Sequence, residues 1–381
     1  MSDHPASRPI RCVVISEIPV SYRSGLFDEI HRRANIDLRV VYLAEGQSDR
    51  PWETGGSADG DWISVERSLH LGSTAQGYFP RLTPGLGHTL SRLQPDTVVL
   101  PGWAHPACWQ AALWCRRHHR PYGVMAETWH QQAETRLPTK LTSTVRDRIL
   151  AGSALGMPAG ELAADYLRHH GAPHVKVVHA NTCDAVSIAE KTADVSKLSA
   201  PSVVYIGRLM EHKGASLVIG LARRLADHGI TMRIAGDGPM RAEIEALAQS
   251  IESVEFVGPV APDTAHRLMA EATVVVVPSL KEPWGVVLHE ALACGTPVVA
   301  TNQVGSAADL IGARSAHHPA GVIVEPNLED LVTGCVKTVE HPASSAICRQ
   351  AALAVNYEST AAEFELAADA IMGNANARAA I

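Results

Sequence analysis

Two glutamates bracket the start of an expected helix in KEPWGVVLHEALACGTPVVAT, residues 281–301. Pro283 keeps Glu282 out of helical geometry, so the helix is expected to begin near Gly285, with Glu290 about one turn inside. The first amide groups of a helix have no partner within it and attract anions. The segment therefore predicts a bound phosphate, with the two carboxylates accepting hydrogen bonds from sugar hydroxyls on either side. The alternative is a pair of carboxylates of which one complements the helix dipole and the other is solvated.

A second candidate phosphate contact lies in YIGRLMEHKGA, residues 205–215. A strand is expected to end at Gly207, and the next helix to start near Gly214. Arg208 and Lys213 flank that turn, and together they suit a diphosphate, the arginine as a fork and the lysine as a point charge. Read alone, the two side chains also fit ordinary surface cations.

Two more turns follow expected strands, in AGDGPM (235–240) and FVGPV (256–260). Gly236 is expected to shape the backbone beside the ligand, and Asp237 to cap a helix rather than to catalyse. The backbone around Val257 could pair with the edge of a planar base. No Walker A pattern occurs and the G-x-G lacks a third glycine, which disfavours P-loop and dinucleotide sites.

These motifs follow short β-branched runs that recur along the chain and alternate with segments of helical spacing. Most runs are continuous rather than alternating, which is typical of strands covered on both faces. The sequence therefore predicts an α/β fold with parallel sheets. The first series comprises residues 11–16, 37–43, 96–101, 122–127 and 174–180, and the second 202–207, 231–236, 254–258, 272–278, 296–301 and 320–325. The rhythm breaks at residues 181–200, which we interpret as a linker between two Rossmann-like domains.

Composition excludes several function classes. The 381 residues are 46% hydrophobic and 19% charged, which allows large cores and argues against disorder. Residues 1–190 carry 19 basic and 19 acidic side chains, while 191–381 carry 14 and 21, so the net charge of -7 comes from the second half. A nucleic-acid-binding domain would normally be strongly basic, and we expect no nucleic-acid partner.

The seven cysteines form no C-x-x-C pair, which favours reduced thiols over a disulfide framework or a zinc site. The first residues lack a signal-peptide core, and no apolar run is long enough to span a bilayer. We therefore expect a cytoplasmic protein without a transmembrane segment. The basic cluster RRHHR (116–120) leaves peripheral attachment to a membrane open.

The chain resembles the retaining glycosyltransferases of family 4, which have the GT-B fold of two Rossmann-like domains facing a central cleft. The resemblance rests on EPWGVVLHE (282–290) as an E-x7-E motif, on GRLMEHKG (207–214) and on GDGP (236–239), in the family's order and spacing. It is strong over residues 200–330 and looser in the first half, through SYRSGLFDEIHRR (21–33). It implies an acceptor-binding domain over 1–185, a nucleotide-sugar domain over 186–355, and a last helix (356–381) that packs back on the first domain.

The resemblance implies roles for the donor-side residues. Arg208 and Lys213 would hold the diphosphate of a UDP- or GDP-type sugar donor, Glu290 the ribose and Glu282 the hydroxyls of the sugar. The amides of Gly285 and Val286 would contact phosphate or sugar. The full expected donor set is Gly207, Arg208, Lys213, Gly236, Val257, Glu282, Pro283, Trp284, Gly285, Val286 and Glu290, and the expected catalytic set is Glu127, Arg208, Lys213 and Glu282.

The acceptor side departs from the family pattern. Many relatives have a Gly-Gly pair in the first loop, where this chain has only Gly25, and a histidine where it has Glu127 and Thr128. Glu127 could bind the acceptor or sugar, receive the acceptor's proton, or be a plain loop residue. Trp103 and His105 follow another strand of the first domain and could stack on or bond the acceptor, or simply pack. The remaining expected acceptor contacts are Tyr22 and Arg23.

The implied activity is a retaining glycosyl transfer of hexosyltransferase type, without a metal ion or other cofactor. No D-x-D motif occurs at a plausible position, in keeping with metal independence. The leaving diphosphate would be stabilised by the two cations and the helix amides. Alternatives are a GT-B sugar-nucleotide epimerase or phosphorylase, although no lysine stands out for a pyridoxal cofactor, and a catalytically silent subunit that binds sugar nucleotides. The donor base and sugar, the acceptor (small molecule, glycan or glycolipid precursor) and a homodimeric state stay open.

Overall fold

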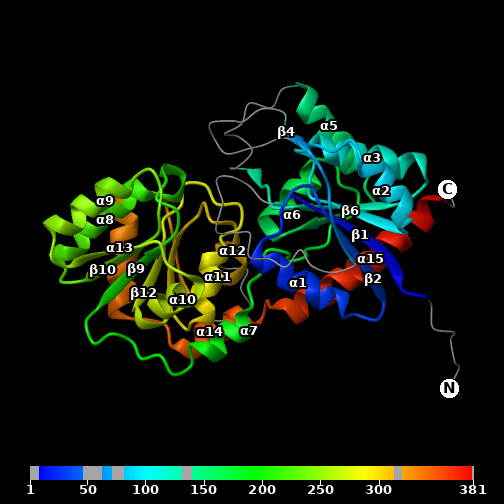
Figure 1. Cartoon of the computed structure of the whole chain (residues 1–381). Coiled ribbons are helices and arrows are strands. Elements are labelled where there is room, and N and C mark those ends of the chain that lie inside the picture. The colour runs from blue at the N-terminus through cyan, green and yellow to red at the C-terminus, as the bar shows by residue number, and fades with distance from the viewer. Residues whose placement is uncertain (1–7, 46–61, 71–80, 131–139, 313–319, 380–381) are drawn as a thin grey trace, which may run out of the picture. The chain divides into compact units, whose positions relative to one another are not determined.

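The protein is described here by a computed structural model that covers residues 8–45, 62–70, 81–130, 140–312 and 320–379. The chain forms two compact units. Unit 1 comprises Met1–Asn181 and Tyr357–Ile381, and unit 2 comprises Thr182–Asn356 (Figure 1). The crossing into unit 2 thus lies slightly before the boundary expected at residue 185.

Unit 1 is built on a six-stranded parallel sheet with the strand order β3-β2-β1-β6-β7-β8. The order reverses between β1 and β6, and the loops that follow these two strands leave the same edge of the sheet. The strands are β1 (Ile10–Ser16), β2 (Ile36–Tyr42), β3 (Ile63–Val65), β6 (Thr97–Leu100), β7 (Tyr122–Ala126) and β8 (Leu155–Pro158), with a separate hairpin of β4 (Leu69–His70) and β5 (Arg81–Leu82).

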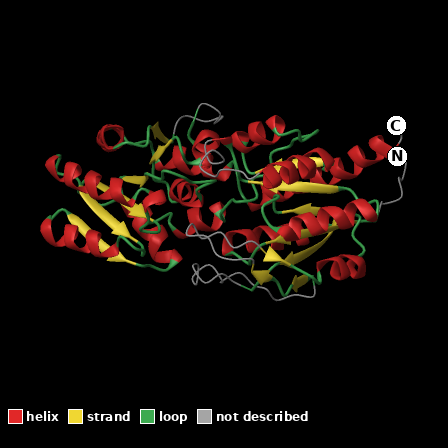
Figure 2. Ribbon diagram, turned by 90° about the horizontal axis from the view of Figure 1, so that it is seen from above, coloured by secondary structure: helices red, strands yellow, loops and turns green. Residues whose placement is uncertain are grey.

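Helices cover both faces of this sheet, so its strands can be apolar throughout (Figure 2). One face packs on α1 and α15, the latter coming from the far end of the chain, and the other on α2, α3, α5 and α6. The helices are α1 (Ser21–His31), α2 (Leu86–Leu93), α3 (Pro106–Arg117), α5 (Lys140–Gly152), α6 (Glu161–His169) and α15 (Tyr357–Ala379).

Unit 2 repeats the arrangement, with a parallel sheet of order β11-β10-β9-β12-β13-β14 that reverses between β9 and β12. Its strands are β9 (Ser202–Ile206), β10 (Thr231–Ala235), β11 (Val254–Gly258), β12 (Val274–Val277), β13 (Val298–Thr301) and β14 (Gly321–Val324). The α/β class and the two parallel sheets predicted from the sequence are confirmed.

The helices of unit 2 also form two layers. One contains α8, α9 and α13, and the other α7, α10, α11, α12 and α14. Their bounds are α7 (Ala185–Lys191), α8 (Ala215–Asp227), α9 (Arg241–Ser250), α10 (Pro262–Glu271), α11 (Val286–Ala293), α12 (Gly305–Leu310), α13 (Leu328–Glu340) and α14 (Ser345–Leu353), with a 3-10 turn η1 at Glu211–Lys213.

Two expectations about elements were wrong, and one strand was not predicted. Residues 174–180 form no strand, and only Val175 pairs, as a single bridge to Gly156. The edge position next to β7 is taken instead by β8, whose sequence LGMP has no strand-like pattern and which is stabilised by pairing with its neighbour. The supposed linker contains α7, because Asp184 caps that helix and Ala185 and Ile188 are buried in the core of unit 2.

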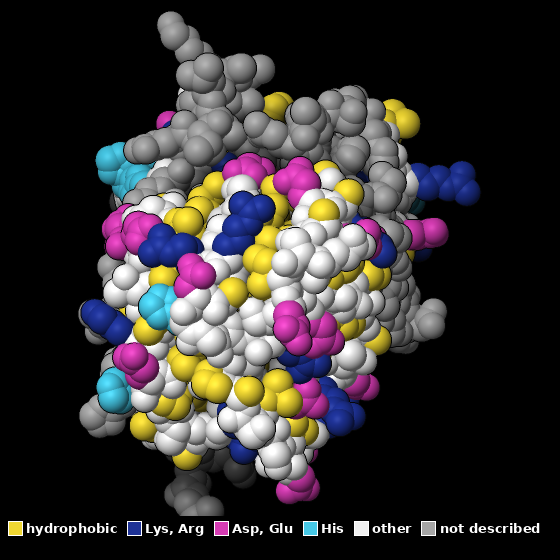
Figure 3. All heavy atoms as spheres, turned by 90° about the vertical axis from the view of Figure 1, so that its left-hand side faces the viewer, with side chains coloured by type: hydrophobic (Ala, Val, Ile, Leu, Met, Phe, Trp, Pro, Cys, Tyr) yellow, Lys and Arg dark blue, Asp and Glu magenta, His cyan; other side chains and the backbone are white. Residues whose placement is uncertain are grey.

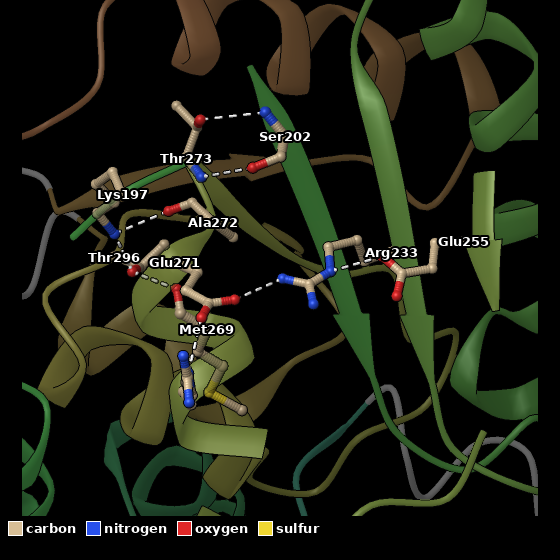
Figure 4. A network of polar contacts seen from close by, with 10 residues as sticks. Lys197, Ser202, Arg233, Glu255, Met269, Glu271, Ala272, Thr273 and Thr296 are labelled. Atoms are coloured by element: carbon tan, nitrogen blue, oxygen red, sulfur yellow. Dashed lines mark hydrogen bonds and ion pairs between the residues drawn. The ribbon is translucent and has the colours of Figure 1, made fainter. Parts of the chain in front are cut away.

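Polar groups at the amino ends of the strands of unit 2 are bonded to one another (Figure 4). Ser202, at the start of β9, receives a hydrogen bond at its carbonyl from the Thr273 amide (3.0 Å), and its own amide donates to the Thr273 hydroxyl (3.1 Å). Arg233 donates to Glu271 (2.8 Å) and Glu255 (3.0 Å). Because these groups satisfy one another, this edge of the sheet is structural, and a ligand site is expected at the opposite, carboxyl edge.

All seven cysteines are free thiols and buried. Burial raises the pKa of Cys12 and of Cys335 to about 12, so these thiols are protonated and unreactive. Among the described residues, no helix is both long enough and apolar enough to cross a bilayer.

Candidate active site

The loops after β9 and β12 lie against each other at the point where the strand order of unit 2 reverses. The carbonyl of His212 accepts hydrogen bonds from the amides of Leu280 (3.0 Å) and Lys281 (3.1 Å). Gly214 has a φ of +78°, and a Cβ there would lie 2.1 Å from the carbonyl oxygen of Pro278. Only glycine fits this contact, which brings the two motifs found in the sequence together.

Lys213 and Glu282 form an ion pair across these two loops, in which the ammonium donates to the carboxylate. Their side chains are 19% and 12% exposed, so the pair is largely shielded from water. The sequence predicted both residues for the site, but with different partners. The contact joins positions 69 residues apart and has no signature in the sequence.

Arg208 is a second cation at this edge. The hydroxyl of Tyr205 donates to the carbonyl of Arg208 (2.7 Å) and fixes the backbone at the end of β9. Within the described part of the chain, the guanidinium has no carboxylate partner. Burial, helped by the charges of Lys213 and Arg208, lowers the pKa of His212 to about 4, so this imidazole is neutral near pH 7.

This unpaired arginine contrasts with the outer surface of unit 2. There Arg224 pairs with Glu329 (2.6 Å) and Arg241 with Glu245 (2.7 Å). The face drawn in Figure 3 shows basic and acidic side chains interspersed, without a field of one sign. The positive charge at the carboxyl edge is therefore a local feature that suits a small anion.

The amino terminus of α11 lies next to this cationic edge. Its N-cap, Gly285, has a φ of +94° and no side-chain cap, and Ser306 donates to its carbonyl (3.2 Å). The amides of Gly285, Val286 and Val287 have no hydrogen-bond partner among the described residues. Free amides at a positive helix end can bind an anion, and the phosphate expected here from the sequence stays a prediction.

The glutamates and neighbouring side chains of this loop are held in different ways. Glu290, on the first turns of α11, lies 3.7 Å from His266 of α10, a partner that the sequence did not reveal. Trp284 is only 3% exposed, so its indole is part of the core and its backbone is what faces the loop. Pro283 is half-buried between Glu282 and Trp284.

The glycine turns after β9 and β10 pack on each other. A Cβ on Gly236, whose φ is +146°, would lie 1.9 Å from the carbonyl oxygen of Gly207. The amide of Gly236 donates to the carbonyl of Gly258 (2.8 Å), which places half-buried Val257 beside the same turn. The expected helix cap by Asp237 is wrong, because α9 begins at Arg241 and the Asp237 carboxylate accepts from the adjacent Gly238 amide (2.9 Å).

The expected acceptor residues gather at the carboxyl edge of unit 1. Arg23, at the start of α1, donates to Glu127 (2.7 Å) and to Asn181 (2.5 Å), and its guanidinium lies 5.9 Å from the centre of the Tyr22 ring. Thr128 is half-buried directly after Glu127. The sequence missed Asn181.

Gly25 lies inside α1, where a Cβ would come within 2.6 Å of the Tyr357 ring of α15. Packing of two helices therefore accounts for this glycine without a ligand.

Trp103 and His105 follow β6 on the same edge. Trp103 is stacked on Tyr166 with ring centres 5.9 Å apart, and its carbonyl accepts from the Trp109 indole (2.6 Å). His105 is buried, with Nε2 3.6 Å from a carboxylate oxygen of Glu17. Glu17 directly follows β1, so the rule that sites form at carboxyl strand ends could have revealed it.

Comparison with known proteins adds a family likeness to this geometry. Residues 189–354 match the glycosyl transferases group 1 family model. This group 1 region covers most of unit 2 and less than half of the chain. It contains Arg208, Lys213, Glu282 and Glu290, the side chains at the carboxyl edge.

Curated relatives are similar over part of their length. The chain is 36% identical over 141 residues to an uncharacterised glycosyltransferase of Methanocaldococcus jannaschii, covering 36% of this chain and 35% of the relative. It is 35% identical over 130 residues to the alpha-maltose-1-phosphate synthase of Mycolicibacterium smegmatis, covering 32% and 33%. The matched part thus spans about a third of each relative.

Structural similarity covers nearly the whole chain. HepE of Anabaena in complex with UDP superposes with a TM-score of 0.67 at 19% identity, covering 93% of this chain and 99% of that one. The predicted GT-B fold is therefore confirmed. In the described part of the chain, no three His, Cys, Asp or Glu side chains are arranged to hold a metal ion.

Proposed function

We propose that the protein is a retaining glycosyltransferase that transfers a hexosyl group from a nucleoside-diphosphate sugar to a hydroxylated acceptor. The observation that carries the proposal is the carboxyl edge of unit 2, where Arg208, Lys213 and the free amides of α11 form a small anion site. The family match over residues 189–354 supports it, as does the fold shared with HepE, which was solved with UDP.

Each donor-side residue has a distinct role in this proposal. Arg208, Lys213 and the amides of Gly285 and Val286 bind the diphosphate and stabilise the charge that develops as it leaves. Glu290 accepts a hydrogen bond from the ribose. Because these groups supply the stabilisation, we propose that transfer needs no metal ion.

The donor sugar is bound by Glu282, whose carboxylate accepts hydrogen bonds from its hydroxyls. The acceptor attacks the anomeric carbon on the face from which the diphosphate departs. The leaving phosphate takes the acceptor's proton, so the configuration is retained without a covalent intermediate.

The acceptor is assigned to the carboxyl edge of unit 1, with Tyr22, Arg23, Trp103, His105 and Thr128 as candidate contacts. A carboxylate that accepts a charge-assisted hydrogen bond from a guanidinium is held in a fixed position, from which it can orient a hydroxyl group. Since Glu127 is bonded in this way to Arg23, we assign it to acceptor binding rather than to proton removal. Gly25 contributes by allowing α1 and α15 to pack closely.

The test is incubation with a panel of UDP-, GDP- and ADP-sugars, measuring release of nucleoside diphosphate with and without candidate acceptors. Acceptor-dependent release, with products of retained configuration by NMR, supports the proposal. Tight binding without release would instead indicate a silent binding subunit. Lys213→Ala and Glu290→Ala should each reduce transfer by roughly 100-fold or more. Arg224→Ala, which removes an exposed cation paired with Glu329, is the matched control and should retain activity.

A further inference from the structure

The ion pair between Lys213 and Glu282 has a consequence for which ligands the site binds tightly. The inference rests on the function proposed above, in which the ammonium binds the diphosphate and the carboxylate binds the sugar. In the structure each of these groups is bonded to the other. An arriving donor therefore competes with this contact for the N–H groups of the lysine and the oxygens of the glutamate.

The pair is held in a defined place by its backbone. The loop of Lys213 is bonded to the loop of Glu282 through the His212 carbonyl, at 3.0 and 3.1 Å. The amide of Glu282 donates to Gln303 (3.1 Å) and its carbonyl accepts from Gly305 (3.1 Å), so the segment is fixed on its other side as well. The side-chain contact is thus independent of the bonds that fix the loops, and it can open without rearranging them.

The other candidate anion-binding groups at this edge are not bonded to a carboxylate among the described residues. Arg208 has no carboxylate partner among the described residues, and the amides of Gly285 and Val286 are unpaired there. His212 is neutral near pH 7 because its pKa is lowered to about 4 by burial and by neighbouring cations. An arriving diphosphate therefore finds Arg208 and the α11 amides without a competing carboxylate, whereas at Lys213 it competes with Glu282 for the ammonium.

We propose that the Lys213–Glu282 pair makes the site discriminate between a sugar nucleotide and a bare nucleoside diphosphate. Both ligands compete with the ion pair for Lys213, and so weaken its contact with Glu282. Only the sugar nucleotide offers hydroxyls to the released carboxylate, whereas the bare diphosphate leaves Glu282 unpaired beside its own negative charge. The pair weakens binding of the nucleoside diphosphate, and so favours release of that product after transfer.

The direction in which one substitution changes the affinity for nucleoside diphosphate tests this proposal. Glu282→Gln removes the competing charge, so the nucleoside diphosphate released by the wild-type enzyme should bind roughly three- to tenfold more tightly by titration calorimetry. The same variant should bind the sugar nucleotide no more tightly than wild type does and should lose transfer activity. Unchanged or weaker binding of the bare diphosphate would overturn the proposal.

Two variants separate the ion pair from a general charge effect. Glu211→Gln removes a carboxylate two positions from Lys213 that bonds Ser216 (2.9 Å) rather than the lysine, and it should leave the affinity unchanged. An equal gain in affinity for nucleoside diphosphate in Glu211→Gln and Glu282→Gln would refute the specific role of Glu282. Glu282→Asp keeps the charge but shortens the side chain, so it should give an intermediate affinity. Wild-type affinity in Glu282→Asp would refute the proposal even if Glu282→Gln failed to fold.

Failure of the proposed function and failure of the ion-pair proposal would give different binding results. If the wild-type protein binds none of UDP, GDP and ADP, the donor site itself is wrongly assigned. If it binds one of them and Glu282→Gln does not tighten that binding, only the role of the ion pair is refuted.

Discussion

The guanidinium of Arg23 donates a 2.7 Å hydrogen bond to the carboxylate of Glu127 at the carboxyl edge of the sheet of unit 1. The same nitrogen donates to Asn181, the last residue before the chain crosses into unit 2. The arginine side chain is 13% exposed and the glutamate side chain 40%, so the carboxylate keeps one open side. Glu127 is therefore one partner of an ion pair, in line with the proposal that it binds the acceptor.

Substitution of Glu127 by Gln should therefore act mainly on the acceptor. We expect the acceptor KM to rise roughly tenfold, while kcat falls less than tenfold and the affinity for nucleoside diphosphate is unchanged. Removal of a true general base would instead lower kcat by roughly 100-fold or more, and steady-state kinetics would reveal it. Arg32→Met, which breaks an exposed pair with Glu29 on the same helix, is the control.

Gly214→Ala should destabilise unit 2 more than an equivalent change at Gly229. Both glycines have positive φ, +78° and +68°, so each alanine costs about 1 kcal/mol in backbone strain. Only at Gly214 would the new Cβ also meet the Pro278 carbonyl, at 2.1 Å, whereas nothing lies within 4 Å at Gly229. Urea unfolding should show the larger loss for Gly214→Ala, and equal losses would contradict the close contact between the loops.

Asp96 should make stability depend on pH in the acid range. Burial raises the pKa of this carboxyl, but hydrogen bonds from Arg8 and Arg11 outweigh burial and lower the pKa from 3.8 to about 2. A lowered pKa in the folded state stabilises the protein above the unfolded value, and the contribution disappears as pH falls through about 2. It is on the order of 2 kcal/mol near pH 7.

Asp96→Asn should accordingly be less stable than wild type at pH 7. The difference in free energy of unfolding should shrink as the pH falls from about 4 to 2, measured by urea unfolding at each pH. Asp165→Asn removes an exposed carboxylate that pairs with Arg168 and should show little pH-dependent difference. A gap between Asp96→Asn and wild type that stayed constant down to pH 2 would argue against the lowered pKa.

His289 should be more tolerant of a polar than of an apolar substitution. It is fully buried on α11, with Nε2 2.9 Å from the Ala352 carbonyl and Nδ1 3.3 Å from the Thr182 hydroxyl. Because a carbonyl only accepts, Nε2 carries the proton, and Nδ1 is left to accept from the hydroxyl. His289→Leu removes both hydrogen bonds of the ring, although the Ala352 carbonyl still accepts from the Val355 amide (3.2 Å) and the Thr182 hydroxyl still has the Cys183 carbonyl within 3.3 Å. It should therefore cost about 1 kcal/mol in urea unfolding, and His289→Gln less. Equal losses would show that packing alone determines the effect.

The sequence predicted the elements whose signals are local. The start of α11 was predicted from Pro283 and Gly285, and Gly285 is the N-cap of the helix with a positive φ of +94°. Continuous valine-rich runs likewise predicted the strands β12 and β13 from local sequence alone. The strand β8 was missed because its four residues include Gly156 and Pro158, so its pairing with β7 depends on the tertiary structure rather than on local preference.

The sequence predicted which residues to consider for the candidate site, but not which contacts those residues make with one another. The positions of Glu282 and Glu290 near a helix start, and of Arg208 and Lys213 around a turn, were local patterns. The partners that define their chemistry are distant in the chain, as in the contacts of Lys213 with Glu282 and of His266 with Glu290. Such contacts depend on which strand ends become neighbours, and no spacing encodes that.

Unit 1 consists of two segments that are far apart in the sequence, so the ribosome synthesises them at different times. Its first segment is synthesised before unit 2, but α15, which covers one face of its sheet, is synthesised only afterwards. Unit 2 is continuous in sequence and can reach its native state while the nascent chain is still attached. During that interval the part of the sheet that α15 covers in the native state is exposed, although α1 already packs on the same face, and such exposed apolar surface favours non-native association.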